Sequence, residues 1–284
     1  MTEIRVAFVM LLAIAPALAD IRLDDSESKV KQPRKLRFER YIFSAAAPPA
    51  AGDATNPSAD EVAAKPSAQP AADTPTNAAS ELPFMLFEPK AKKGAKLPLI
   101  VYLHDGGKRA AANGEQVDGA ALFRTDPPVQ KEHPCFLFAP LSKEPWSGPG
   151  WQQADQRNLP AKPEPSLELV FQCIDELIAT HPIDPDRIYL AGHGMGGAGA
   201  LTAAAYRPDL FAAVAATTPQ MHRNAAPKLL TLPIAIVAAE GDEGARHREI
   251  VDEIKQAGGA KVELFPSGEP ESYDWLFQHK RAKQ

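Results

Sequence analysis

Apolar runs and segments of helical periodicity alternate through the second part of the chain. A short strand is predicted at 83–88, and a continuous apolar run, typical of a strand covered on both faces, follows at 97–103. Further strands are predicted at 134–139, 187–191, 211–217, 233–239 and 261–265. Apolar residues recur at helical spacing over 166–181, 195–206 and 244–257. This alternation of buried strands and helices predicts an α/β fold, with a mostly parallel sheet and helices on both of its faces.

The first 19 residues have the pattern of an export signal. An apolar run at 6–15 leads to Ala17-Leu18-Ala19, an A-x-A-like cleavage site before Asp20. The run is too short to span a bilayer, and Arg5 is the one basic residue before it. We expect a cleaved signal peptide, export to the periplasm or beyond, and no transmembrane span after cleavage. An uncleaved anchor, or an apolar start arising by chance, is the alternative.

Three further segments follow the signal. Residues 20–44 form a charged N-terminal segment, in which the alternation at 36–43 is typical of an edge strand. The Ala/Pro-rich segment 45–80 has almost no large apolar side chain, so burial cannot offset the entropy of ordering it. It is predicted to be a disordered insertion or linker, and the folded domain is expected at 81–284.

Composition limits the partners and cofactors. The formal net charge of −5 argues against nucleic acid as a general partner. The two cysteines, Cys135 and Cys173, lie in apolar surroundings and are expected to be separately buried thiols, with a disulfide as the alternative in an exported chain. No residues have the spacing of zinc ligands, so no metal or other cofactor is expected.

A glycine-rich corner carries the strongest functional signal. Gly192-His193-Gly194-Met195-Gly196-Gly197 lies between the strand at 187–191 and the alanine-rich helix at 195–206. The G-x-S-x-G nucleophile elbow is built at such a corner, with its serine exposed above the sheet. Gly194 occupies the position of that serine, so the pattern has the shape of an elbow without its nucleophile.

The same order of motifs is found in a known family. The residues that carry the likeness are 98–104, Arg109, 133–136, 183–189, Gly192 with 195–197, and 207–213. On these residues, the part from Leu82 to Trp275 resembles the exported esterase and peptidase-like α/β-hydrolases related to polyhydroxybutyrate depolymerases and feruloyl esterases. The resemblance implies an α/β-hydrolase fold and a site at the carboxyl ends of the strands.

The resemblance also implies a triad, and two of its three positions are altered. The family nucleophile falls on Gly194, and the family acid on Asp242, which without a histidine is also interpretable as an ordinary loop carboxylate. The family histidine falls at or beside Pro270, and proline can neither take nor give a proton. Loss of triad members that act as a unit removes nearly all of their contribution. We expect Gly194→Ser to destabilise the fold by roughly 1 kcal/mol and to restore no activity alone.

The oxyanion hole is expected to persist in part. Its implied donors are the backbone N–H of Met195 and one from the loop 104–107, where Asp105 and Gly106 are the candidates. Asp105 replaces the first glycine of the family's His-Gly-x-Gly. A carboxylate there would oppose a developing oxyanion unless it points away.

Five side chains are further candidates for the pocket. His104 is expected to support the oxyanion loop, and His193 to pack or hydrogen-bond beside the corner. His222 is expected at the surface or lining the pocket, with a general base as the alternative. Trp146 and Trp151 suit either stacking on a substrate or packing of their long loop, whereas His279 is expected to be solvated.

These observations lead to one hypothesis and two rivals. The chain is interpreted as an exported α/β-hydrolase-fold protein without its ordinary triad, which binds an unknown small molecule or polymer in the old pocket as a binding or accessory module. The first rival is an active ester or peptide hydrolase with a rearranged site that uses His193 or His222. The second is an envelope interaction protein working through residues 20–80.

Overall fold

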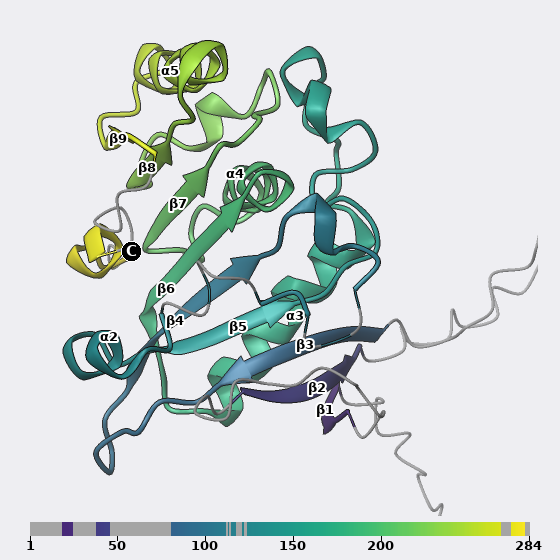
Figure 1. Ribbon diagram of the computed structural model, residues 1–284, viewed down its shortest axis with the longest axis vertical. Helices are drawn as coiled ribbons and strands as arrows, with labels where there is room; N and C mark the ends of the chain where they lie inside the picture. The colour runs from purple at the N-terminus through teal and green to yellow at the C-terminus, as the bar shows by residue number, and fades with distance from the viewer. Residues whose placement is uncertain are drawn as a thin grey trace, which may run out of the picture.

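The computed structural model describes residues 19–24, 38–45, 81–111, 113, 115–117, 121, 124–267 and 274–281, apart from the side chains of Asp242 and Glu243. One twisted nine-stranded sheet organises these residues, with the strand order β1-β2-β3-β5-β4-β6-β7-β8-β9 (Figure 1). The strands are β1 Asp20–Leu23, β2 Phe38–Ser44, β3 Glu81–Phe87, β4 Leu97–Leu103, β5 Phe136–Pro140, β6 Ile183–His193, β7 Ala213–Thr217, β8 Ile234–Val237 and β9 Val262–Phe265.

The sheet is parallel from β5 to β9 and antiparallel at its other end. Neighbouring strands in the series β5, β4, β6, β7, β8, β9 run parallel. The pairs β1–β2, β2–β3 and β3–β5 are antiparallel. Strand β4 is buried along its whole length, as its unbroken apolar sequence predicted. The carboxyl ends of these six parallel strands therefore lie on one side of the sheet, where loops can build a site.

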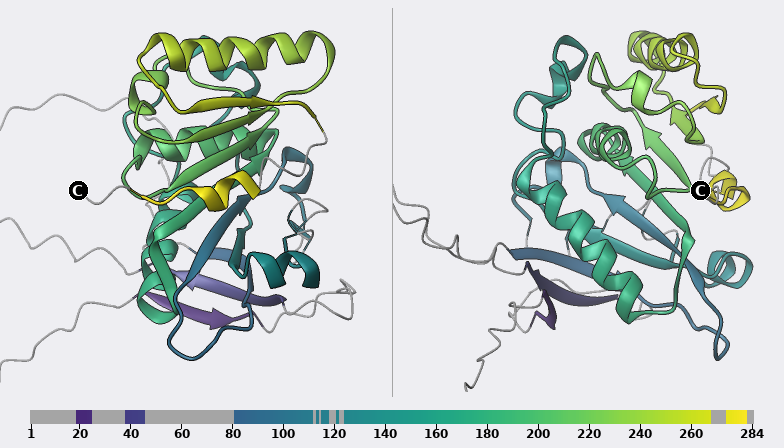
Figure 2. Two further views of the ribbon diagram at one scale, coloured as in Figure 1. Left: turned by 90° about the vertical axis from the view of Figure 1, so that its left-hand side faces the viewer. Right: turned by 180° about the vertical axis from the view of Figure 1, so that it is seen from behind.

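The two faces of the sheet are covered unequally. The helices are α2 Pro127–Glu132, α3 Pro165–Thr180, α4 Met195–Tyr206 and α5 Gly241–Gln256, with 3₁₀ segments η1 Gly106–Lys108, η2 Trp151–Gln156, η3 Ala226–Lys228 and η4 Trp275–Gln278. Helices α3, α4 and α5 contribute to one large apolar core. On the opposite face η4 packs on a second core, and Figure 2 shows α2 on that side as well. The prediction of helices on both faces is confirmed, although the second face has only short ones.

The sheet begins earlier in the chain than the hydrophobic pattern predicted. Strand β1 pairs with β2 from Asp20–Ser44 to Leu23–Tyr41, and β2 pairs in turn with β3. The prediction that 36–43 forms an edge strand is therefore wrong, because β1 takes the edge and β2 is an inner strand. The charged segment 20–44 thus contributes two strands to the same sheet as the rest of the domain.

Several expectations concern residues beyond those described. The signal sequence up to residue 18 and most of the Ala/Pro-rich segment, 46–80, lie outside the described residues. Within the described ranges, none of the helices has the length and apolarity needed to cross a membrane. Cys135 and Cys173 are both buried and unbonded, so the prediction of two separate thiols is confirmed.

Candidate functional site

The glycine corner forms a sharp strand-to-helix turn at the carboxyl end of β6. Gly194 has φ 55° and ψ −113° and is the N-cap of α4. Its N–H donates to Thr217 O of β7 at 2.9 Å, and its carbonyl accepts from the Ala198 N–H at 2.9 Å. A positive φ is accessible to glycine without a steric cost, whereas a residue with a Cβ is strained there. The local geometry is that of the predicted elbow.

Helix α4 begins very close to the sheet because its first turn has no side chains in the way. A Cβ placed on Gly196 would collide with the carbonyl of Leu103 in β4, and one on Gly192 would collide with the carbonyl of Gly196. Neither obstacle is a movable side chain, since both are backbone atoms. The glycines of the corner are therefore required by packing, whatever chemistry the corner carries.

The carboxylate of Asp105 fills the space beside Gly194. The Met195 N–H donates to Asp105 Oδ1 at 3.1 Å. A Cβ added to Gly194 would collide with this oxygen and would lie 3.1 Å from Asp105 Cγ. An anion at the N-terminus of α4 is favoured by the helix dipole and by the unpaired N–H groups there. The carboxylate thus lies where a side chain at position 194 would start and accepts the hydrogen bond predicted for an oxyanion.

The His104 ring supports the loop of Asp105 through hydrogen bonds to the backbone. Its ring is fully buried, and its Nε2 accepts from the Ser142 N–H at 3.1 Å. Because Nε2 accepts, a neutral ring carries its proton on Nδ1, which lies 2.8 Å from the Asp105 carbonyl and donates to it. His104 therefore lies beneath the site and has no ring nitrogen directed at Gly194.

The two loop tryptophans have different environments. Trp146 is fully buried, donates from Nε1 to the His104 carbonyl at 3.1 Å, and packs against α4 at Gly199. Of the two roles expected for Trp146, packing of its loop is confirmed and stacking on a ligand is wrong, because its ring is part of the core. Trp151 is only partly buried, and its Cζ2 lies 3.8 Å from the position of a Cβ on Gly106. Of the two rings, Trp151 is the one near Gly106, whose Cβ position also lies 3.8 Å from Met195 Cβ.

The candidate histidines are not gathered at the corner. His193 is exposed at the end of β6, so the expected packing role is wrong. His222 is buried, and neither of its ring nitrogens has a hydrogen-bond partner in the described part of the chain. Burial lowers the pKa of His222, although the nearby backbone of Ser147 and Arg157 acts in the opposite direction. The expectation that His222 lies at the surface is therefore wrong, whereas its place beside a pocket stays a prediction.

The two remaining triad positions lie partly outside the described residues. Asp242 falls in the first turn of α5 rather than in a loop, because this helix begins at Gly241, earlier than its amphipathic pattern indicated. Its side chain and the whole of Pro270 are not described. A further buried histidine, His247 on α5, was not among the candidates predicted from the sequence. It is buried, and its Nδ1 accepts from the Ala239 N–H at 3.2 Å, just after β8.

Metal ligands are not clustered in the part of the chain that the structure covers. No group of three or more His, Cys, Asp or Glu among its residues could hold an ion. What the site offers is a carboxylate fixed on a helix N-terminus beside a partly buried indole. Such a pair can contact a ligand, but it contains no hydroxyl or thiol placed to attack one.

Known proteins share this part of the fold. A family model described as "Putative esterase" matches residues 168–257, which run from α3 to α5 and include the glycine corner. A putative esterase, NocK, of Nocardia uniformis subsp. tsuyamanensis is 33% identical over 94 residues, 33% of this chain and 27% of that protein. Cutinase est2 of Thermobifida alba is 43% identical over 60 residues, 21% of this chain and 19% of that protein.

A solved structure extends the likeness to most of the described domain. A thermostable esterase superposes with a TM-score of 0.61 at 30% identity, covering 72% of this chain and 61% of that one. The likeness thus spans less than two thirds of that structure and about a quarter or less of the two other relatives' lengths. The chain has an α/β-hydrolase fold and is related to the esterases of that fold, as the sequence motifs predicted.

Proposed function

We propose that this protein is an exported α/β-hydrolase-fold protein that binds a small molecule or polymer at the former elbow without hydrolysing it by a Ser-His-Asp mechanism. It would act as a binding or accessory module. Export rests on the signal-like residues 1–19, of which the structure describes only Ala19. Loss of hydrolysis rests on Gly194, on Pro270 at the histidine position, and on the geometry around Asp105.

The observation that carries the proposal is the position of the Asp105 carboxylate. It bonds to the Met195 N–H and lies where the side chain of residue 194 would be. An oxyanion hole works because its donors point at the position where negative charge develops. A fixed negative charge at that position repels an oxyanion and also uses one of its donors. The nucleophile and its stabiliser are thus replaced together, which a single substitution would not do.

The same carboxylate suggests how a ligand could be held. Trp151 is partly buried, and its Cζ2 lies 3.8 Å from the position of a Cβ on Gly106, the residue that follows Asp105. Aromatic rings contribute large contact areas at low entropic cost and often fix a ligand in a pocket. We therefore expect an ester with an aromatic acid group to bind near Trp151 and to remain intact.

Hydrolysis and binding can be measured separately on the purified protein. With a panel of p-nitrophenyl esters of increasing chain length, we expect no turnover above the rate in buffer, and no covalent labelling by a fluorophosphonate probe. Methyl ferulate should quench tryptophan fluorescence, and Trp151→Ala should weaken that binding about tenfold, as for the loss of one aromatic anchor. Gly107→Ala is the matched control, since a Cβ there has no atom within 4 Å.

Turnover well above the buffer rate would contradict the proposal, especially if His193→Ala abolished it. His193 is the appropriate test residue for a rearranged site because it is exposed beside Gly194. Binding of methyl ferulate that Trp151→Ala leaves unchanged would contradict the placement of the ligand.

A further inference from the structure

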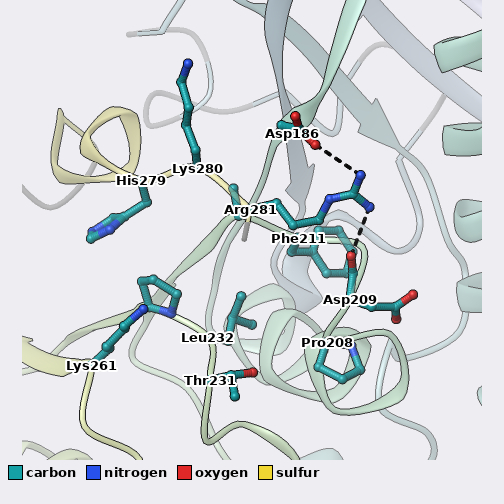
Figure 3. Close-up of a pocket in the computed structure, with 12 residues that line it drawn as sticks. Asp186, Pro208, Asp209, Phe211, Thr231, Leu232, Lys261, His279, Lys280 and Arg281 are labelled. Atoms are coloured by element: carbon teal, nitrogen blue, oxygen red, sulfur yellow. Dashed lines mark hydrogen bonds and ion pairs between the residues drawn. The ribbon is translucent and has the colours of Figure 1, made fainter. Parts of the chain in front are cut away.

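A second cavity lies at the amino ends of the parallel strands, opposite the glycine corner. It has a volume of about 720 Å³, within the range of small-molecule sites. Its wall is built from Asp186 near the start of β6, Phe211 before β7, Leu232 before β8 and Lys261 before β9. The C-terminal residues 279–281 close one side (Figure 3). This amino-end pocket shares none of its lining residues with the glycine corner.

The C-terminal wall is fixed in place by Arg281. Its guanidinium donates to Asp186 Oδ1 at 3.2 Å and to the Asp209 carbonyl at 3.1 Å, and its N–H donates to the Asp186 carbonyl at 2.9 Å. Figure 3 shows the guanidinium turned toward Asp186 and Asp209. The pocket is therefore largely formed before any ligand enters, which lowers the entropic cost of binding.

The acidic groups around the pocket already have cationic neighbours. Asp186 is paired with Arg281, and Asp209 has Arg207 Nε at 3.8 Å from its carboxylate. Asp184, close enough for Lys280 to affect its pKa, is bound to Arg187 at 2.6 Å. Glu263 accepts from Trp275 Nε1 at 2.9 Å. The negative charges near the cavity are thus largely neutralised or engaged.

Two lysines of the pocket are not engaged in ion pairs among the described residues, although Asp184 is close enough to Lys280 for their charges to interact. Lys261 and Lys280 make no ion pair with the residues that the structure describes, in a chain whose net charge is −5. Figure 3 shows the Lys261 side chain directed toward the other lining residues and the Lys280 side chain extending away from them. His279, which was expected to be solvated, instead packs on Trp275 with ring centroids 4.1 Å apart. Burial lowers the pKa of His279; the charge of Glu263 opposes this shift, and the charge of Lys261 adds a smaller lowering effect.

Apart from Thr231, the rest of the lining is apolar. Phe211 and Leu232 are nearly inaccessible and form a rigid floor, and Pro208 and Pro233 flank them. A fully hydrated ion such as sulfate gains little from such a floor. An anion with an apolar body gains both burial of that body and a charge-assisted contact with a lysine.

We propose that the amino-end pocket binds a small organic carboxylate, with its apolar body over Phe211 and Leu232 and its carboxylate on Lys261. Lys280 adds charge at the rim and steers the anion inward. The site is separate from the elbow and does not depend on the function proposed for it. Its ligand class is defined by charge and by the apolar floor together.

Benzoate and its uncharged isostere benzamide distinguish these two contributions. We expect benzoate to shift the NMR signal of the Trp275 indole N–H with a millimolar dissociation constant, and benzamide to bind at least about tenfold more weakly. Lys261→Gln should weaken benzoate binding about tenfold, and Lys280→Gln about threefold. Both effects should shrink in 0.5 M salt because the charges are partly exposed.

The control variant is Lys255→Gln, which removes an exposed lysine from the end of α5 outside the pocket. Unfolding curves should show that all three variants keep the wild-type stability. Equal binding of benzoate and benzamide, no shift of the indole signal with either probe, or equal effects of Lys261→Gln and Lys255→Gln would each overturn the proposal. Variants at Gly194 and Asp105 should leave benzoate binding unchanged, so failure here is distinguishable from failure of the elbow proposal.

Discussion

The two ends of the parallel strands differ in what their polar groups are free to do. At the carboxyl end, the Met195 N–H donates a hydrogen bond to the Asp105 carboxylate, which takes up the space beside Gly194. At the amino end, the carboxylates are paired, and Lys261 and Lys280 remain without an ion pair among the described residues. At the carboxyl end, a protein carboxylate fills the space beside the glycine corner. At the amino end, a cavity is lined by two lysines that make no ion pair with the described residues. The fold alone would have directed attention only to the carboxyl end.

The largest expected effect comes from adding a side chain within the glycine corner. Gly196→Ala places a Cβ against the Leu103 carbonyl, 2.6 Å from its carbon, and backbone atoms cannot turn aside. We expect a loss of about 3 kcal/mol in the free energy of unfolding, at the upper end for overpacking. Gly107→Ala, whose Cβ meets open space, should stay within about 0.5 kcal/mol of the wild type in the same denaturant titration. Similar midpoints for the two variants would show that α4 does not approach β4 as closely as the structure has it.

The buried His222, near the carboxyl ends of the strands, gives the next effect. Burial lowers the pKa of His222 below the ordinary value of histidine, about 6.5, so at acid pH the unfolded chain takes up a proton that the folded chain resists. The stability from the neutral ring is fully present above pH 6.5 and is lost as pH falls through the lowered pKa. His222→Leu should therefore reduce the slope of unfolding free energy against pH between pH 7 and 5. Parallel curves for the variant and the wild type would contradict the burial of this ring.

A smaller effect tests the amino end. Arg281→Gln removes the contacts to Asp186 and to the Asp209 carbonyl, which are partly exposed. We expect a loss of about 1 kcal/mol, reduced by salt, since partly exposed ion pairs contribute little. The informative readout is binding of benzoate, which should weaken more than Arg207→Gln weakens it, because Arg281 holds the pocket wall and Arg207 lies outside its lining. Wild-type benzoate binding by Arg281→Gln would show that the wall is formed without it.

The parts of the fold that the sequence predicted best are those with a strong local pattern. Strand β4 and helix α4 were predicted to the residue, because seven successive buried positions and an alanine-rich run after the glycine corner each have one interpretation. Strand β1 has only four residues, three of them exposed, so no periodicity revealed it. The start of α5 was missed because Gly241 and Gly244 weaken helical propensity in a turn that is nevertheless helical.

The site was predictable in position but not in orientation. The motif placed Gly194, Met195 and Asp105 at one edge of the sheet, whereas the direction of the Asp105 side chain depends on the backbone of η1. The burial of His222 and the packing of His279 on Trp275 are tertiary contacts between segments far from any shared motif. Periodicity carries no information on which way a loop residue faces.

The most direct test of the account is a double-mutant cycle between positions 105 and 194. In the wild type, Gly194→Ser should cost about 2 kcal/mol, from the strain of a positive φ and from the collision with Asp105. In an Asp105→Ala background the same change should cost only about 1 kcal/mol, because the collision is removed and the strain remains. A coupling near zero, or a Gly194→Ser variant more stable than the wild type, would show that the Asp105 carboxylate does not occupy the space where a side chain at position 194 would lie.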